Sequence, residues 1–459
     1  MFDKFLTDGC FSRRGMLGTS VGFLGMGLPS WLQMAKTASA AQQPERTKSC
    51  ILLYCWGGMS HHEVFDPKPD AHVEIRGEFS PIETATPGIM VGEHIPLLAR
   101  QTDKLAIIRS MHHNQSAHGR GMYWNLTGHE PPPFPAGNIA PAPHHWPSLP
   151  AMVSKFRPAP RGVPRAVRLP YPMVDNGTLQ AGEYGGWMGV KYDPIVMRTP
   201  AGKPWKGVSR TLGSEVLELG KNVDLKRIDT RKQLLRSLER PVSENADFES
   251  FEHFRQLATD MMLSSGVKDA YDLESEDPKI RETYGDHLGG QSMLLARRLI
   301  EAGVPIVQIL CSAGDLNGGS GDMWDTHGNN FNRLKNDLLP PFDRGASALL
   351  GDLEDRGMLD ETLVVILTEF GRTPKINGGA GRDHYPNVYS VALAGGGIRG
   401  GQVYGSSDGN GAFPRTKPTT PADLHATIFR ALGISPRAEI HDMLERAFAV
   451  SDGNVLPLF

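Results

Sequence analysis

Histidine and carboxylate side chains gather at several places in the sequence, each beside a short apolar run. Imidazole nitrogens and carboxylate oxygens are protein ligands of zinc, manganese and iron. Roughly three to six such ligands from separate loops would form one or two metal sites, and a divalent cation there would polarise the oxygens of an ester. The candidate metal ligands are His61, Asp325, His327, Glu369, Asp383 and His384.

A second group of candidates lies in the histidine-rich segment 110–120. Ser116 or His118 would attack an ester or activate water, and Arg120 would clamp an anion. A predicted helix begins here, and a helix N-terminus stabilises negative charge. Two other roles remain open. A serine at a helix start is equally expected as an N-cap, and Arg120 would serve as well in an ordinary surface ion pair.

None of these motifs identifies a site by itself. An Asp-x-His pair such as Asp325 and His327 is more often a turn carboxylate near a surface imidazole than a pair of ligands. The adjacent side chains of His112 and His113 would point apart on an extended chain. The metal prediction therefore rests on the joint placement of the motifs beside strands.

The elements that must position these residues follow from hydrophobic periodicity. Helical periodicity over residues 291–302 and 334–353, each followed by a glycine and then a strand, indicates repeated helix-to-strand steps. We predict an α/β fold with a doubly wound, mostly parallel sheet between layers of helices. Ligands of such sheets bind beyond the carboxyl ends of the strands, where the candidate residues fall. The predicted strands are residues 51–56, 105–108, 304–311, 363–367 and 388–394.

Two segments of residues 41–459 depart from this pattern. Residues 131–172 are rich in proline, which cannot donate to a β ladder, so we expect a long surface excursion there. Residues from about 209 to 279 are charged and helix-favouring, which indicates a helical insertion or cap.

Residues 1–40 are typical of an export leader rather than of structure. The pair Arg13-Arg14 precedes a glycine-rich, mostly apolar stretch at 17–32, and a small-residue cleavage site follows at Ala38-Ser39-Ala40. We expect recognition by the twin-arginine translocase, cleavage after this site, no stable membrane anchor afterwards, and a periplasmic or extracellular location. Because substrates of that route cross already folded, the leader implies that a metal can be inserted before export.

Charge and cysteine content exclude some function classes. The formal net charge is −3, and the leader carries four basic and two acidic residues, which leaves −5 on the mature part. Nothing in this balance suggests nucleic acid as a partner. After removal of Cys10 with the leader, Cys50, Cys55 and Cys311 remain, an odd number without metal or haem spacing. We predict that they are packing residues and form no disulfide framework.

Five motifs follow one another along the mature chain: Gly57–His61 with Phe65–Pro69, Arg109–His112, Asp325–Asn330, Thr368–Pro374 and Gly381–His384. Together they resemble an exported sulfatase-like family catalogued as domain of unknown function 1501. The resemblance spans most of the mature chain, because the five motifs occur in the family's order and the leader is present too. It implies the fold of the alkaline-phosphatase and sulfatase superfamily.

The resemblance to sulfatases also shows departures. Sulfatases place a metal-binding aspartate directly after the first strand, where this chain has Trp56-Gly57-Gly58, unless His61 or Glu63 replaces it. The position of the sulfatases' oxidised cysteine falls on His118, so a formylglycine nucleophile is excluded. Residues 116–128 resemble the nucleophile helix, and residues 423–434 resemble the final helix of sulfatases.

These observations lead to a functional prediction with two alternatives. The resemblance and the ligand set predict an exported metal-dependent hydrolase of sulfate or phosphate esters, acting on a small molecule or a glycan. The missing first-strand aspartate supports a different class, a non-catalytic binding or scaffolding protein that kept the fold. A metal-dependent mutase or transferase would share the fold. Aromatic rings would stack on sugars, although large aromatic residues are more commonly packed in the core or in loops. The candidates are Trp124, Trp146, Trp187 and Trp324.

Overall fold

A computed structural model of the chain describes residues 48–133, 137–175, 177–196, 230, 234, 246–263, 265–311 and 324–459. These residues belong to one compact unit, Arg46–Phe459. The predicted leader and much of the predicted insertion lie outside the described residues. No helix of the described part combines the length and the apolar character needed to cross a bilayer.

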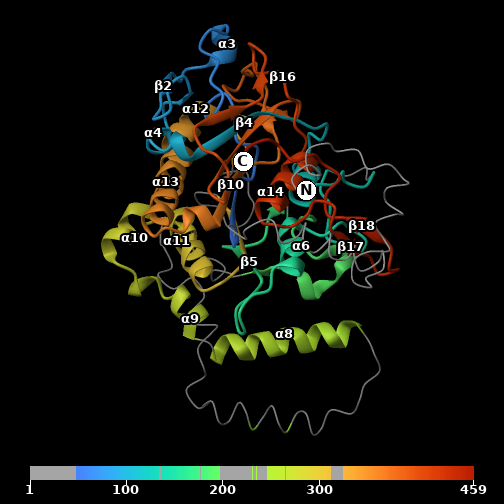
Figure 1. Cartoon of the computed structure of the whole chain (residues 1–459). Helices are drawn as coiled ribbons and strands as arrows, with labels where there is room; N and C mark the ends of the chain where they lie inside the picture. Colours follow the sequence, from blue (N-terminus) through green and yellow to red (C-terminus); the bar gives the residue numbers. More distant parts are fainter. Residues whose placement is uncertain are drawn as a thin grey trace, which may run out of the picture. The chain divides into compact units, whose positions relative to one another are not determined.

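An eight-stranded sheet forms the centre of the unit, in the order β14-β4-β13-β10-β1-β9-β5-β8 (Figure 1). All neighbouring strands run parallel except at β13, which is antiparallel to both β10 and β4. The predicted mostly parallel sheet is confirmed. Its strands are β1 (Ser49–Tyr54), β4 (Leu105–Met111), β5 (Ala166–Leu169), β8 (Ile195–Val196), β9 (Ile306–Leu310), β10 (Thr362–Leu367), β13 (Tyr389–Ala394) and β14 (Gln402–Tyr404).

The central strands are mostly apolar because both faces of the sheet are covered. Every residue of β1, β9 and β10 is buried. Their register pairs Ser49 with Thr362, whose hydroxyls lie 3.1 Å apart, and Leu52 with Val365. Mostly apolar runs, unbroken over residues 51–54 of β1 and 363–367 of β10 and interrupted by Gln308 in β9, therefore predicted these strands correctly.

Helices flank the sheet on two sides in Figure 1, with α11 and α13 to the left of the strands and α6 and α14 to the right. Helix α11 contacts β1 and β9 and packs on α13, α6 contacts β5 and β9, and α14 contacts α5. These contacts build the predicted doubly wound arrangement. The longer helices are α5 (His118–Thr127), α6 (Leu149–Phe156), α8 (Ala246–Leu263), α11 (Leu288–Glu301), α13 (Leu339–Asp355) and α14 (Pro421–Ala431).

Shorter elements fill the loops. The short helices are α3 (Val73–Arg76), α4 (Pro96–Ala99), α9 (Ser265–Tyr271), α10 (Pro278–Tyr284) and α12 (Asn330–Arg333), and a π-helix over Leu334–Leu338 leads into α13. Two-stranded pairs are β2 (Pro81–Glu83) with β3 (Met90–Gly92), β6 (Val174–Asp175) with β7 (Thr178–Leu179), β11 (Gly371–Arg372) with β12 (His384–Tyr385), β15 (Ser406–Ser407) with β16 (Pro414–Thr416), and β17 (Glu439–His441) with β18 (Ala447–Ala449).

The prediction of a surface excursion over residues 131–172 is wrong for its second half. Helix α6 is buried over six of its eight residues, and β5 is a fully buried strand of the central sheet beside β9. Pro150 lies in the first turn of α6, where no backbone N–H is needed. The four residues of β5 contain no proline, so their N–H groups can join the ladder. The segment 131–172 as a whole is rich in proline, but all of these prolines lie outside the strand β5.

Two other predictions can be compared with the described residues. The described part of the 209–279 insertion is helical, since α8 and α9 lie in it. Cys50, Cys55 and Cys311 are buried and unpaired, as predicted.

Strand direction brings the candidate residues to one edge of the sheet. Because β1, β4, β9 and β10 point the same way, the segments that follow them all emerge at the carboxyl edge. Strand β13 runs the other way, so the segment that precedes it, including His384, arrives at the same edge. Ligands before β13 and after the other strands can therefore meet.

Candidate metal centre

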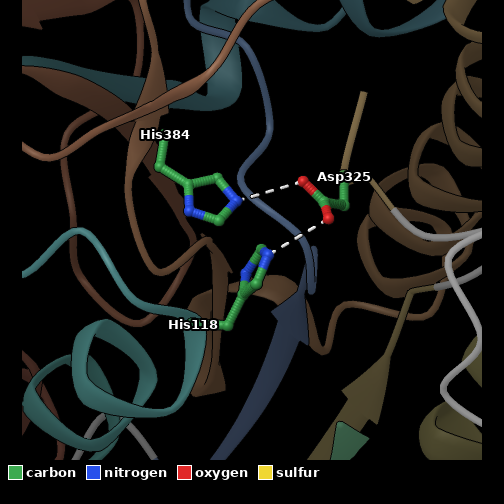
Figure 2. A group of neighbouring side chains, drawn as sticks. All are labelled: His118, Asp325 and His384. Atoms are coloured by element: carbon green, nitrogen blue, oxygen red, sulfur yellow. Dashed lines mark hydrogen bonds and ion pairs between the residues drawn. The ribbon is translucent and has the colours of Figure 1, made fainter. Parts of the chain in front are cut away.

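Three side chains from distant parts of the sequence converge at this edge: His118, Asp325 and His384 (Figure 2). His118 is the first residue of α5, Asp325 lies in the connection after β9, and His384 lies in β12. Nε2 of His118 lies 3.3 Å from Oδ2 of Asp325, and Nε2 of His384 lies 3.2 Å from Oδ1. In the described part of the chain, these three residues form a group of potential metal ligands, because one donor atom from each lies within 4.8 Å of the other two.

A fourth donor atom adjoins the three. Nε2 of His327 lies 3.2 Å from Oδ1 of Asp325 and 2.9 Å from Nε2 of His384. Ligands held 2.0–2.1 Å from a tetrahedral ion are separated by about 3.3 Å. The spacing of the atoms of His118, Asp325 and His384 therefore fits a single divalent ion held by two imidazoles and one carboxylate, and His327 lies beside this group next to Asp325 and His384.

Hydrogen bonds at the other ring nitrogen indicate the tautomer of each imidazole. Nδ1 of His384 lies 2.7 Å from the carbonyl oxygen of Ser116, which can only accept, so this nitrogen carries the proton. Nδ1 of His118 lies 2.7 Å from Glu369, and Nδ1 of His327 lies 2.7 Å from Asp383. With protons on all three Nδ1 atoms, the lone pairs of the neutral rings lie on the three Nε2 atoms that face Asp325. This is the arrangement that metal-binding histidines adopt in proteins.

Glu369 is buried and holds His118 from behind. Its Oε1 also accepts the N–H of Gly57 at 2.7 Å, so two donors fix that oxygen. The backbone carbonyl of Glu369 accepts bonds from His113 at 2.6 Å and from Asn125 at 2.9 Å. Glu369 was predicted as a ligand, and the structure places it against the outer nitrogen of His118 instead.

Charges around the centre shift the pKa values of its members. Burial opposes protonation of His118, but hydrogen bonds to Asp325 and Glu369 outweigh it and raise the pKa to about 9. Burial also disfavours the charged form of Asp325, yet its contacts with His118 and His384 and the charge of Arg372 hold its pKa well below the usual range. Burial lowers the pKa of His384, against the opposing effect of Asp325. The metal-free centre therefore holds a charged carboxylate, a protonated His118 and a neutral His384.

Aromatic rings contact the two partly buried imidazoles of His118 and His384. The ring of His118 lies between Trp56 at 5.2 Å and Phe370 at 5.1 Å, and Phe370 lies 4.5 Å from the ring of His384. These contacts exclude water from one side of the centre and restrict the rotamers of both histidines. His327 and Asp383, in contrast, are about half exposed.

The structure separates the predicted ligands into two groups. Asp325, His327 and His384 present donor atoms to the centre, and Glu369 and Asp383 bind the outer nitrogens of its histidines. His61 does not join them.

The imidazole of His61 has a different partner. It is buried, its Nε2 bonds to the carbonyl oxygen of Gly411 at 2.9 Å, and its ring contacts that of His62. Glu63, the other proposed replacement for the first-strand aspartate, is buried in an ion pair with Arg382 at 2.7 Å. Neither residue substitutes for that aspartate, because each is committed to a partner elsewhere.

Gly57 lies in the Trp56-Gly57-Gly58 segment directly after β1, where the resemblance predicted a ligand aspartate, and its surroundings exclude a side chain. Its φ is +114°, and a Cβ at this position would lie 2.5 Å from the backbone nitrogen of Asp325 and 2.7 Å from that of Trp324. The turn after β1 is thus packed directly against the turn that carries Asp325. Close backbone approach, rather than ligation, explains this glycine.

Of the three predicted catalytic residues, His118 lies within the centre among the potential metal ligands, whereas Ser116 and Arg120 lie at and beyond its rim. Ser116 is exposed, two residues before His118, and its carbonyl oxygen holds His384. It is not the N-cap of α5, because that position is taken by Ala117. Arg120 contacts the side chain of Gln115 at 2.5 Å and the carbonyl oxygen of Pro132 at 3.0 Å.

Sequence reasoning missed the guanidinium nearest the centre. Arg372 is fully buried, and its Nη2 lies 2.6 Å from Oδ1 of Asp325. The signal was available, because a charged residue five positions after the apolar run 363–367 must find partners if it is buried.

The tryptophans proposed for sugar stacking are mainly packing residues. Trp324 is buried with its indole N–H donated to the carbonyl oxygen of Cys311 at 2.6 Å, and Trp187 is buried as well. Trp146 stacks at 3.5 Å on His129, which covers a face of its indole. These contacts leave little of the predicted stacking surface.

Comparisons with known proteins give a family and distant structural likenesses. The family model described as "Protein of unknown function (DUF1501)" matches residues 47–458. No curated protein matches the sequence. Solved structures that are similar include a sulfatase, PsFucS1, from a Pseudoalteromonas species, at 12% identity and a TM-score of 0.34, covering 89% of this chain and 72% of the other.

Two further solved structures are similar at the same level. One is an alkaline phosphatase superfamily protein from Vibrio parahaemolyticus, at 10% identity and a TM-score of 0.38, covering 85% of this chain and 67% of the other. The second is a phosphonate monoester hydrolase, SpPMH, from Silicibacter pomeroyi, at 11% identity and a TM-score of 0.33, covering 89% and 76%. With TM-scores this low, we draw no functional argument from these likenesses.

Proposed function

The chain belongs to the DUF1501 family, and we propose that it is an exported, metal-dependent hydrolase of sulfate or phosphate esters. The observation that carries the proposal is the convergence of three imidazole Nε2 atoms on the carboxylate of Asp325. Imidazole with carboxylate suits zinc, manganese or iron. Bound there, the ion supplies positive charge that polarises the oxygens of the ester.

The chain's own residues support an anionic substrate at this place. Helix α5 begins at His118 without a side-chain N-cap, so its first backbone N–H groups are available to an anion. Because both nitrogens of His118 are engaged, with Glu369 and Asp325, we assign the attacking group to the hydroxyl of Ser116 or to water. Trp56 and Phe370 keep the buried side of the site dry, which strengthens its electrostatic interactions.

The proposal includes export. Twin-arginine recognition of residues 1–40 and cleavage near Ala41 would deliver the folded, metal-loaded protein to the periplasm or the exterior. Replacing Arg13 and Arg14 by lysine is expected to leave an uncleaved precursor inside the cell, detected by intact-mass analysis of cell fractions. Export unchanged in this variant would refute the twin-arginine route.

One observation favours a second function, a binding or scaffolding protein that holds a metal without turnover. Gly57 occupies the position of the first-strand carboxylate and leaves no room for one. The site then has fewer acidic ligands than a hydrolytic centre of the predicted kind.

Elemental analysis combined with hydrolysis assays separates the two functions. We expect the folded protein to hold about one equivalent of a divalent metal and to hydrolyse members of an aryl sulfate and aryl phosphate panel. Asp325→Asn and His384→Asn should each lose metal and turnover. Metal without turnover on any ester would support the binding role, and absence of both would refute the hydrolase.

Three further variants complete the design. His61→Gln serves as the matched control, because it changes a buried histidine outside the centre and retains a donor for Gly411. Ser116→Ala distinguishes the nucleophiles, because loss of turnover with full metal content would assign the attack to the hydroxyl. Arg120→Gln tests the anion clamp and should raise KM if that role holds.

A further inference from the structure

Arg372 is a fully buried cation whose partners are nearly all backbone carbonyl groups. Its Nε donates to the carbonyl oxygen of Gly58 at 2.9 Å, and its Nη1 donates to that of Arg382 at 3.0 Å. Its Nη2 contacts Oδ1 of Asp325 at 2.6 Å, the carbonyl oxygen of Trp324 at 3.2 Å and the carbonyl oxygen of Gly57. Each nitrogen of the guanidinium thus has at least one acceptor.

These acceptors come from separate loops at the carboxyl edge of the sheet. Gly57 and Gly58 follow β1, Trp324 is adjacent to the ligand Asp325, and Arg382 precedes the ligand His384 by two residues. Arg372 itself lies in β11, beyond β10, and pairs with His384 across the β11–β12 ladder. One side chain therefore cross-links the loops that carry two of the proposed ligands to the turn after the first strand.

We propose that Arg372 is the positioning residue that assembles the metal centre before the ion binds. The inference rests on the proposed metal-dependent function. Arg372 fixes Asp325 by one carboxylate oxygen and holds the backbone on the N-terminal side of Asp325 and His384. The apoprotein then presents its ligands already in place, so that ion binding requires little reordering of the loops.

Arg372 has two opposing effects on the affinity for the metal. We expect its positioning of the ligands, which strengthens binding, to outweigh its positive charge, which weakens binding. The guanidinium repels a divalent ion near Asp325, which would weaken binding. Removing it, however, leaves buried carbonyl oxygens of three loops without a donor and frees the carboxylate to rotate. Loss of partners that orient metal ligands typically lowers metal affinity by about 10–100-fold.

Lysine separates geometry from charge at this position. An ammonium group keeps the positive charge but lacks the planar fork that reaches acceptors on several loops at once. If Arg372 acts by position, Arg372→Lys should behave like Arg372→Met rather than like the wild type.

The test is calorimetric titration of metal-free protein with zinc. We expect about 10–100-fold weaker zinc binding in both Arg372→Lys and Arg372→Met, with thermal unfolding in chelator confirming that each variant is folded. Arg168→Lys is the matched control, because Arg168 is equally buried and pairs with Glu183 at 2.8 Å outside the ligand loops. It should bind zinc as the wild type does. Wild-type affinity in Arg372→Lys, or tighter binding in Arg372→Met, would overturn the positioning role.

A second measurement uses the wild type alone, in case the variants do not fold. Hydrogen exchange of residues 56–60, 324–328 and 380–385 should show nearly the same protection in metal-free and zinc-loaded protein. A large gain of protection on zinc addition would overturn preassembly. A wild type that binds no zinc would instead refute the proposed function, so the two failures are distinguishable.

Discussion

Nδ1 of His118 lies 2.7 Å from Oε1 of Glu369, and the same oxygen accepts the backbone N–H of Gly57. The carboxylate is completely buried, so its charge acts on the imidazole with little screening by water. This pair orients Nε2 of His118 toward Asp325 and increases the basicity of the ring. It links the turn after β1, the segment after β10 and the helix α5 at one point.

Replacing Glu369 by glutamine tests this relationship. The amide keeps the shape but loses the charge, so we expect metal affinity to fall by about 10–100-fold while the fold persists. Zinc titration of the metal-free variant measures the change. Asp343→Asn is the control, since Asp343 of α13 is a buried carboxylate that accepts the backbone N–H groups of Leu97 and Leu98 in α4, away from the centre. Equal zinc affinity in Glu369→Gln and the wild type would contradict the assigned role.

Gly57→Ala should destabilise the fold and abolish metal binding. The new Cβ would overlap the backbone of Asp325 and Trp324, and the residue would also be strained at positive φ. We expect a loss of about 3 kcal/mol in the free energy of unfolding. Gly88→Ala isolates the conformational part, because Gly88 has φ +83° with no atom within 4 Å of the Cβ position, and its cost should be about 1 kcal/mol. Denaturant unfolding compares the two, and similar losses would disprove the crowding at Gly57.

Removing the metal should lower stability without unfolding the protein. A ligand that binds only the native state adds about 2.7 kcal/mol at 100 times its Kd, and the shell of hydrogen bonds around the centre remains when the ion leaves. Thermal unfolding with chelator, and then with excess zinc, measures the difference. Asp325→Asn should unfold at the same temperature in both conditions, and a zinc-dependent shift in that variant would place the ion elsewhere.

Acid should destabilise the metal-free protein between about pH 6.5 and pH 4, because buried neutral histidines must become charged on unfolding. Burial lowers the pKa of both His113 and His425 to about 4. The N–H of Gln115 points at Nδ1 of His113, which further opposes protonation there. Since the unfolded chain binds more protons in this range, stability is complete above pH 6.5 and is lost as pH falls toward 4.

His425→Gln checks this effect, because glutamine can still donate to the carbonyl oxygen of Asn125 but does not titrate. We expect the loss of unfolding free energy over this pH range to shrink by roughly 1–3 kcal/mol. The measurement is denaturant unfolding at several pH values in chelator, with the exposed His441→Gln as control. A pH profile identical to that of the wild type would show that His425 is not among the responsible groups.

Thiol counting tests both burial and leader cleavage. Burial raises the pKa of Cys50 to about 12, and it also raises that of Cys55. The native protein should therefore react very slowly with a disulfide reagent. In denaturant, the cleaved protein should show three thiols, whereas a precursor that keeps Cys10 should show four. Four thiols in protein recovered from the exterior would contradict cleavage.

The sequence by itself determined the layered fold and the chemical type of the site. Continuous apolar runs such as 363–367 can be buried only in a sheet covered on both faces, and the helix-to-strand steps imply parallel connections. Histidines and carboxylates beside these runs must therefore lie at the carboxyl edge of the sheet. In this way Asp325, His327 and His384 could be named as neighbours before their positions were known.

Tertiary structure alone decided which of these groups meet. His61 and His118 both lie in segments that follow parallel strands, but the path of each loop, set by partners hundreds of residues away, turns one toward Gly411 and the other toward Asp325. The reversed direction of β13, which brings His384 to the edge, cannot be read from an apolar run. The same holds for Gly57 and Arg372, because their roles consist of contacts with backbone atoms from distant loops, and such contacts leave no periodic signal in the sequence.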